Sequence, residues 1–320
     1  MNDTSTLSSR PPVPTALVVT AAVTASATLA AGVLRWTGPP PAGYSAIFAP
    51  LGVAPVAGTL ALVALAVSRS RTAPPRSLVV GLGWGAVVLL FWAAGGLALD
   101  AFRAFFAVTG IPAGDFAVVD VPGALVRALS ATTAVVTALH TWSATTPRSA
   151  PVRRRWPRAL ALVMCVPYPA LKVYWWLGGT LGRPEPHTGG VPLMELALFA
   201  TAALLALALT HRPLPGRLVR GGMQAVGWVA ASAGLTMGAL MVFGTAAQLL
   251  GLDDGPVDLD AGAITVLVAL TYATWLVIGV ALLVATLDAR DAARLAVRSG
   301  RERHTAPDVT VRAVRRTVAP

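Results

Sequence analysis

The sequence predicts an all-α membrane protein of eight transmembrane helices, arranged as two tandem four-helix repeats. Hydrophobic residues make up 55% of the 320 residues and charged residues only 12%, whereas soluble proteins carry about 25% charged residues. The apolar residues fall into blocks of about 20, the length of helix that crosses a hydrocarbon core of about 30 Å. Arginine is concentrated between alternate pairs of blocks, as it is in the cytoplasmic loops of membrane proteins.

Eight apolar blocks follow one another, and glycine, proline and charged residues separate them. Each block contains few charges and is long enough to cross the hydrocarbon core as a helix. The predicted spans are residues 15–36, 51–67, 78–99, 124–144, 159–178, 193–210, 223–250 and 263–287.

The distribution of arginine predicts which loops face the cytoplasm. With residues 1–14 inside, the inner loops and the C-terminal segment contain 20 of the 25 basic residues. The other five are Arg35, Arg103, Arg127, Lys172 and Arg183. Eight spans return the chain to its starting side, so the sequence predicts a multi-pass protein of the cytoplasmic membrane with both termini in the cytoplasm.

The first block has an alternative interpretation as a cleavable signal peptide, because Arg10 and an apolar run precede the small residues Ala25, Ser26 and Ala27. The run continues to Trp36, which exceeds the ~7–15 residues of a signal-peptide core and favours an uncleaved span. Cleavage would leave seven spans and would move no other loop.

The two halves of the chain resemble each other with a period near 140 residues. The matched residues keep the same order and are separated by 139 to 144 positions. They pair Trp36 with Trp176, Arg76 with Arg217, Gly83 with Gly227, Gly110 with Gly251, Asp120 with Asp260 and Gly123 with Gly262. Chance similarity between low-complexity apolar segments is the alternative, but it does not favour glycine, aspartate and tryptophan. Four spans per repeat predict two halves related by an axis along the membrane normal.

The sequence therefore divides into five units. Residues 1–14 are a cytoplasmic N-terminal segment, 15–146 the first four-helix repeat and 147–158 an arginine-rich cytoplasmic linker. Residues 159–287 are the second four-helix repeat, and 288–320 are a basic cytoplasmic tail.

Two predicted outer loops are more than simple connections. Residues 100–110 place Phe102, Phe105 and Phe106 on one helical face, which predicts a short helix in the outer membrane interface. Residues 37–50 are uncharged and rich in proline, so we expect this segment to lie on the outer mouth of the protein or to dip into it.

Lys172 is the only lysine, and it lies inside the fifth predicted span. An ammonium group in hydrocarbon is costly, so such residues are usually paired or line a cavity. Pro167 and Pro169 precede it and free helix carbonyls, while Tyr168 and Tyr174 add polar and aromatic groups. A proline-broken helix around a charge is typical of transporter binding sites.

Glu195, in the first turn of the sixth span, is the predicted partner of Lys172, and Arg127 lies at a similar depth in the fourth span. We therefore predict a ligand site or a buried ion pair among Lys172, Glu195, Tyr168, Tyr174 and Arg127. Two alternatives remain open. Lys172 could extend along its own stem to the outer interface, and Glu195 could serve only to stabilise a helix N-terminus.

Several other classes of site are disfavoured. Arginine lies between apolar blocks rather than along one polar face, which argues against nucleic-acid binding. Cys165 is the only cysteine, so no cysteine-based zinc or haem motif is possible, and no cofactor is predicted. His140 is a lone imidazole in the fourth span, where packing is favoured over metal binding.

The acidic residues argue against a metal site, and the missing motifs argue against an enzyme. An outer loop carries Asp253, Asp254, Asp258 and Asp260, but their spacing matches no EF-hand, so no metal is predicted. The sequence contains no His-Glu-x-x-His, Gly-x-Ser-x-Gly or phosphate-loop motif, which argues against an enzyme.

In composition, with Ala/Val/Gly/Leu spans, arginine in place of lysine and Pro/Arg inner loops, the chain resembles multi-pass membrane proteins of high-GC actinobacteria. The resemblance covers the whole chain, and it implies a cytoplasmic membrane location but no activity. The sequence favours transport or binding of a small molecule or ion in the outer half, near Lys172 and Glu195, within the lipid bilayer. The alternative is a non-catalytic scaffold or accessory partner, and a water-accessible cavity lined by Tyr168, Lys172 and Glu195 would favour the first.

Overall fold

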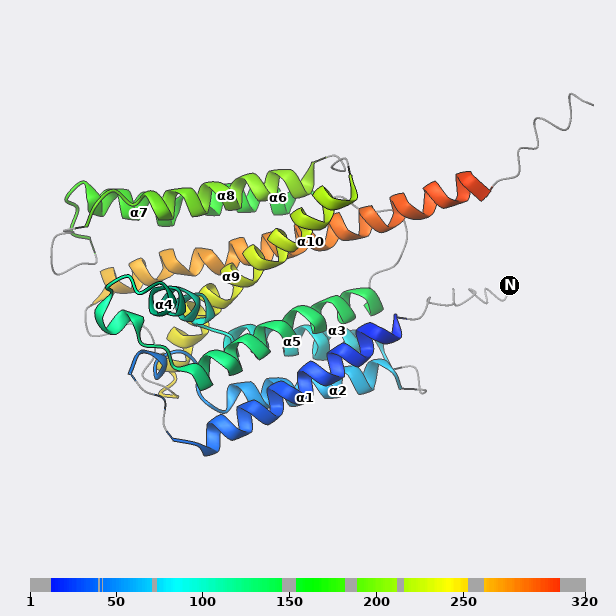
Figure 1. Cartoon of the computed structure of the whole chain (residues 1–320), viewed down its shortest axis with the longest axis horizontal. Coiled ribbons are helices and arrows are strands. Elements are labelled where there is room, and N and C mark those ends of the chain that lie inside the picture. The colour runs from blue at the N-terminus through cyan, green and yellow to red at the C-terminus, as the bar shows by residue number, and fades with distance from the viewer. Residues whose placement is uncertain are drawn as a thin grey trace, which may run out of the picture.

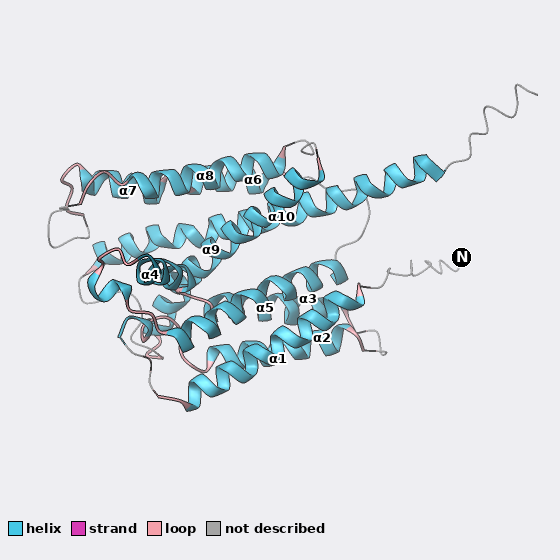
Figure 2. Cartoon of the chain, viewed as in Figure 1, coloured by secondary structure: helices cyan, strands magenta, loops and turns pink. Residues whose placement is uncertain are grey.

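The computed structural model describes residues 13–39, 41, 43–70, 74–145, 154–181, 189–211, 216–252 and 262–305. All of the secondary structure in these residues is helical (Figure 2). Most of the predicted N-terminal segment and of the arginine-rich linker lies outside them, as do the acidic loop at 253–260 and the end of the tail. The predicted all-α fold class is confirmed.

The first bundle consists of α1 (Thr15–Thr37), α2 (Val53–Ser68), α3 (Arg76–Ala93) and α5 (Val121–Thr145). Each of these helices packs against the next, and α5 closes the ring by packing on α1. Small residues allow the helices to approach closely, as is usual in membrane bundles. A Cβ on Gly58 of α2 would lie 2.9 Å from the backbone nitrogen of Leu29 in α1, so no larger side chain fits there.

The second bundle contains α6 (Trp156–Met164), α7 (Pro167–Trp176), α8 (Leu193–Thr210), α9 (Arg217–Leu249) and α10 (Ala263–Thr305). It has the same neighbour order as the first bundle, because α6 packs on α8, α8 on α9, α9 on α10 and α10 on α6. A side chain at Gly238 of α9 would overlap Leu276 of α10. The 43-residue α10 extends well beyond the rest of the molecule (Figure 1).

Among the described residues, seven helical segments are long and apolar enough to cross a membrane, with α3 and α4 counted as one segment and α6 and α7 as another. The second predicted span corresponds to α2, which is apolar but has only 16 residues and is not among these seven. The fifth predicted span is divided into α6 and α7 at Cys165 and Val166. This break precedes Pro167, which has no backbone N–H to continue the helical hydrogen bonds. The start of α1 and the end of α10 lie at the same end of the molecule (Figure 1).

A short helix, α4 (Leu97–Thr109), crosses the other helices and is seen end-on in Figure 1. It leaves α3 through a turn at Gly96, whose φ of 85° is in the left-handed region. Phe102 and Phe105 are exposed on α4, as expected for a helix in a membrane interface. The predicted interfacial helix therefore exists as a helix, beginning three residues earlier than predicted.

The two bundles meet along α9, which packs against α3, α4 and α5. Trp92 of α3 and Phe243 of α9 bring their ring centroids to 5.9 Å. At the opposite end, Nε1 of Trp142 in α5 donates to Asp291 of α10 at 2.7 Å. The bundles are therefore in contact near both ends of the first bundle.

Candidate functional site

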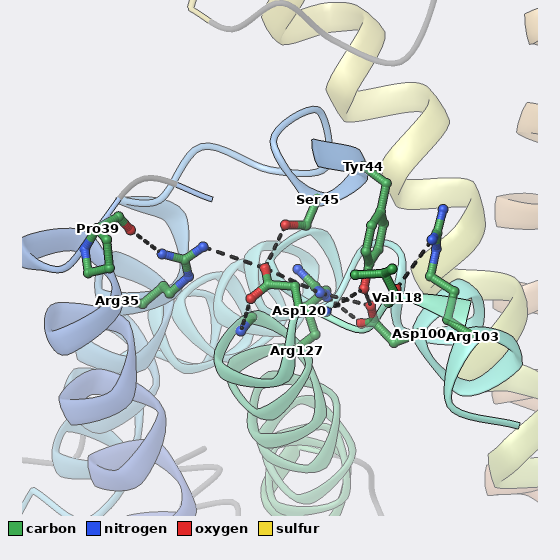
Figure 3. A network of polar contacts seen from close by, with 10 residues as sticks. Arg35, Pro39, Tyr44, Ser45, Asp100, Arg103, Val118, Asp120 and Arg127 are labelled. Carbon is green, nitrogen blue, oxygen red and sulfur yellow. Dashed lines mark hydrogen bonds and ion pairs between the residues drawn. The ribbon is translucent and has the colours of Figure 1, made fainter. Parts of the chain in front are cut away.

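Three of the four ion pairs among the described residues lie where α1 ends and α5 begins, which we call the network end (Figure 3). Arg127 of α5 and Asp100 of α4 form its centre. Their side chains are 8% and 4% exposed. Nε and Nη2 of Arg127 both donate to the Asp100 carboxylate, with Nη2 at 2.8 Å from Oδ1. This bidentate geometry is the strongest form of arginine–carboxylate pairing.

Asp120 supplies a second carboxylate and joins three segments of the chain. Its oxygens accept hydrogen bonds from the Ser45 hydroxyl and from the backbone N–H of Gly123, the latter at 3.1 Å. Nη2 of Arg35 in α1 lies 3.5 Å from Oδ2, and Nη2 of Arg127 lies 4.0 Å from it. Asp120 directly precedes α5 and so also caps its N-terminus.

Tyr44 links the two carboxylates. It belongs to the short 3₁₀ helix η1 (Gly43–Ser45), and its hydroxyl donates to Oδ1 of Asp100 at 2.8 Å. The Tyr44 hydroxyl oxygen in turn accepts from the backbone N–H of Asp120 at 3.0 Å. The Arg103 guanidinium covers the other side of the ring, 3.6 Å from its centroid. Through Tyr44 and Ser45, the segment 43–50 therefore packs into the network end.

Two groups of the network have shifted pKa values. Burial tends to raise the pKa of Asp120, but the Ser45 hydroxyl, the Gly123 N–H, Arg35 and Arg127 together hold it below the usual value. Burial raises the pKa of Tyr44, and its hydrogen bond to Asp100 acts in the same direction. Tyr44 therefore keeps the proton that it donates, and Asp120 stays ionised at neutral pH.

A pocket of about 40 Å³ opens beside this network, room for about three water molecules. Arg35, Ser45, Asp120 and Arg127 line its polar side, and Phe48 is the largest of its apolar residues. Nη1 of Arg127 donates to no acceptor among the described residues and is not sealed from solvent. The pocket thus contains one open donor on a guanidinium that is otherwise held in place.

The residues present define what the pocket can hold. In the described chain no three histidine, cysteine or acidic residues come together as a metal site would require. Both carboxylates of the network are engaged by arginine.

No family model, curated protein or solved structure matches the chain, so the site itself must indicate what it binds. The open guanidinium donor favours a small solute that carries a hydrogen-bond acceptor.

Lys172 lies in the second bundle, within a cage of aromatic rings. Its Nζ is 5.0 Å from the ring centroid of Trp175, 5.3 Å from that of Tyr168 and 5.7 Å from that of Tyr272 in α10. Cation–π attraction of this kind stabilises an ammonium group away from bulk water. The four ion pairs of the described residues include neither Lys172 nor Glu195.

The structure therefore brings only some of the predicted site residues together. Tyr168 contacts Lys172, whereas Tyr174 is exposed and covers Gly179 instead. Glu195 occupies the first turn of α8, and Arg127 belongs to the other bundle.

Sequence reasoning missed two contributors to these clusters. Asp100 directly follows an apolar block, and only the turn at Gly96 brings it under Arg127. Tyr272 lies 100 positions after Lys172, although its spacing of three from Trp275 marked one helical face of the eighth span.

Proposed function

We propose that the chain is an integral membrane protein that binds a small polar solute at the network end of its first bundle. Transport of the bound solute across the membrane is the stronger form of this proposal. The observation that carries the proposal is the open Nη1 of Arg127 in a pocket lined by buried charges. Buried ionisable residues within membrane proteins commonly mark ligand or ion sites, since their burial is costly. The site thus differs from the aromatic cage in the second bundle, because the Lys172 ammonium group itself occupies that cage.

We further propose eight membrane crossings in the cytoplasmic membrane, with both termini inside and the network end outside. The start of α1 and the end of α10 at the same end of the molecule support an even number of crossings, in which α2 crosses in addition to the seven longer segments. At about 1.5 Å per residue, α2 is about 24 Å long, which a modest thinning of the bilayer accommodates. The arginine-rich loops support the orientation.

The internal duplication also remains a proposal, supported by one repeated contact. A side chain on Gly83 of α3 would overlap the Thr141 hydroxyl of α5, and one on Gly227 of α9 would overlap the Thr286 hydroxyl of α10. The second pair follows the first by 144 and 145 residues. The two bundles also share the same neighbour order. Chance similarity of apolar sequence does not account for a matched glycine–threonine contact between helices.

A scaffold without a ligand is the second candidate, because every carboxylate of the network already has an arginine partner. In that case the charges fix the register of α1, α4 and α5 and nothing enters the pocket.

Cysteine labelling distinguishes the two candidates. Cys165 is buried and is the only cysteine, so Cys165→Ala gives a cysteine-free background. Ala49→Cys places a thiol in the pocket lining, and Ala46→Cys, in the same segment but outside the lining, is the matched control. In intact cells a membrane-impermeant thiol reagent is expected to modify both positions. Modification at 46 with none at 49 would reject the pocket, and modification of neither from outside would reject the orientation.

A further inference from the structure

A line of buried polar side chains runs along α5 from the pocket toward the opposite end of the first bundle. We call it the α5 polar file, and it consists of Arg127, Ser130, Thr133, Thr137, His140 and Thr141. The spacing of three and four residues keeps all six on one helical face. From Arg127 to His140 the helix rises by about 20 Å, most of the thickness of a hydrocarbon core.

Both ends of the file reach other polar groups. Arg127 lines the pocket at the network end. In the middle, the hydroxyls of Thr133 and Thr28 of α1 are 2.9 Å apart. At the far end, Nε2 of His140 lies 3.5 Å from the hydroxyl of Ser68, a half-buried residue at the end of α2. The file therefore connects the pocket with the opposite end of the bundle.

Ser130 shows that the file is not fully satisfied by the protein. It is 0% exposed, yet its hydroxyl has no hydrogen-bond partner among the described residues. A buried hydroxyl without a partner costs free energy, so such groups normally bind ordered water. From Arg127 to His140, successive file residues rise by about 4.5–6 Å, a separation that a bridging water between hydroxyls can span.

The second bundle shows what helix packing alone requires. Counted from the Gly83–Thr141 and Gly227–Thr286 contacts, α5 and α10 align at a separation of 145 residues, whereas Gly123 and Gly262 at their starts are 139 apart. The positions that then correspond to Arg127, Ser130, Thr133, Thr137 and His140 are Tyr272, Trp275, Ile278, Leu282 and Ala285. Ile278, Leu282 and Ala285 are buried. Thr286, the counterpart of Thr141, is also buried and polar. Apolar side chains therefore build the equivalent packing at Ile278, Leu282 and Ala285, where the fold does not need polar ones.

We propose that the first bundle conducts protons along the α5 polar file, between the pocket and His140. The inference rests on the proposed function, since the pocket is its entrance and water, whose oxygen accepts from the open guanidinium donor, is the solute that delivers the protons. Each hydroxyl or bridging water accepts a proton on its oxygen and releases its own to the next acceptor. His140 accepts a proton on its unprotonated ring nitrogen and releases one toward Ser68. One proton leaves for each that enters, and only O–H and N–H bonds change.

The charges at the entrance do not oppose this path. The guanidinium of Arg127 is paired with Asp100, and that of Arg35 with Asp120. Arg103 is turned away from the pocket lining, with its Nη1 on the backbone oxygens of Asp115, Phe116 and Val118. The pairs carry no net charge that would repel a proton.

Proton flux into liposomes tests the proposal. The full-length protein is reconstituted with a pH-sensitive dye inside, and a potassium gradient with valinomycin supplies the driving potential. We expect faster acidification than in protein-free liposomes. Thr137→Val keeps the shape and removes one hydroxyl, so it should slow the flux about fivefold, as expected for one hydrogen bond lost from the barrier. Thr137→Ser should retain the flux.

Thr132→Val is the matched control, because Thr132 is exposed on the opposite face of α5 and bonds only to the Ala128 carbonyl. It should conduct as the wild type does. Flux no faster than in protein-free liposomes, equal flux in Thr137→Val and wild type, or an equal loss in Thr132→Val overturns the proposal. If the Ala49→Cys variant is labelled but no flux is seen, the file fails and the pocket stands. If that variant is inert to the thiol reagent and flux is absent, both fail.

Discussion

Replacing Arg127 by methionine should be among the most destabilising single changes at the network end. The side chain is 8% exposed and its partner Asp100 is 4% exposed, so the change leaves a buried carboxylate without its bidentate partner. Only the Tyr44 hydroxyl continues to donate to it. Breaking a buried ion pair from one side costs about 3–5 kcal/mol, and we expect a loss of stability in that range.

A double replacement separates the charge from the packing. In Arg127→Met with Asp100→Leu, no unpaired charge remains, so the loss should be smaller than in Arg127→Met alone. The more exposed pair of Arg154 and Asp288 is the matched control, since its side chains are 34% and 15% exposed. Arg154→Met should therefore cost about 0–1 kcal/mol.

The measurement is the free energy of unfolding in detergent micelles, from titration with a denaturing detergent and followed by loss of helical circular dichroism. The reasoning is refuted if Arg127→Met unfolds within about 1 kcal/mol of the wild type, or if the double variant is less stable than Arg127→Met.

Three further predictions use the same unfolding measurement. Asp120 has a lowered pKa, so its stabilising effect is present above the ordinary value of 3.8 and is lost as the pH falls through the lower folded value. The stability difference between wild type and Asp120→Asn should therefore shrink in acid, and a constant difference would contradict this. Lys172→Met should cost about 1 kcal/mol by removing the cation from its aromatic cage, and Lys172→Arg should cost less. Gly83→Ala should cost about 1–3 kcal/mol, because its Cβ would overlap a threonine on α5. Gly81→Ala, with open space around it, should cost nothing, and equal effects at 81 and 83 would argue against the close contact.

Much of the fold follows from the order of apolar and polar residues. All eight apolar blocks form helices, because a chain that avoids water in long blocks can satisfy its backbone only within each helix. The three phenylalanines in 100–110 also predicted a helix that lies across the others. Lengths were less predictable, since α3 ends at Ala93, α10 continues to Thr305 and the fifth block breaks before Pro167.

The partners of the charged residues could not be read from local patterns. Burial cost singled out Arg127 and Lys172, because it is a property of one side chain in an apolar block. Their partners depend on tertiary contacts. Asp100 reaches Arg127 through the turn at Gly96, and Tyr272 reaches Lys172 from another helix. Proximity along the sequence favoured Glu195, but the structure places aromatic rings around the ammonium.

The length of α10 gives the molecule a rigid arm. Its 43 residues extend for about 65 Å, whereas a bilayer with its headgroups is about 40–45 Å thick. Because Tyr272 of α10 is part of the Lys172 cage, this one helix joins the cage to the C-terminal end of α10, which extends beyond both bundles (Figure 1). A change in the tilt of α10 beside that cage would swing the tip through a larger arc, so events inside the bilayer become displacements in the surrounding water.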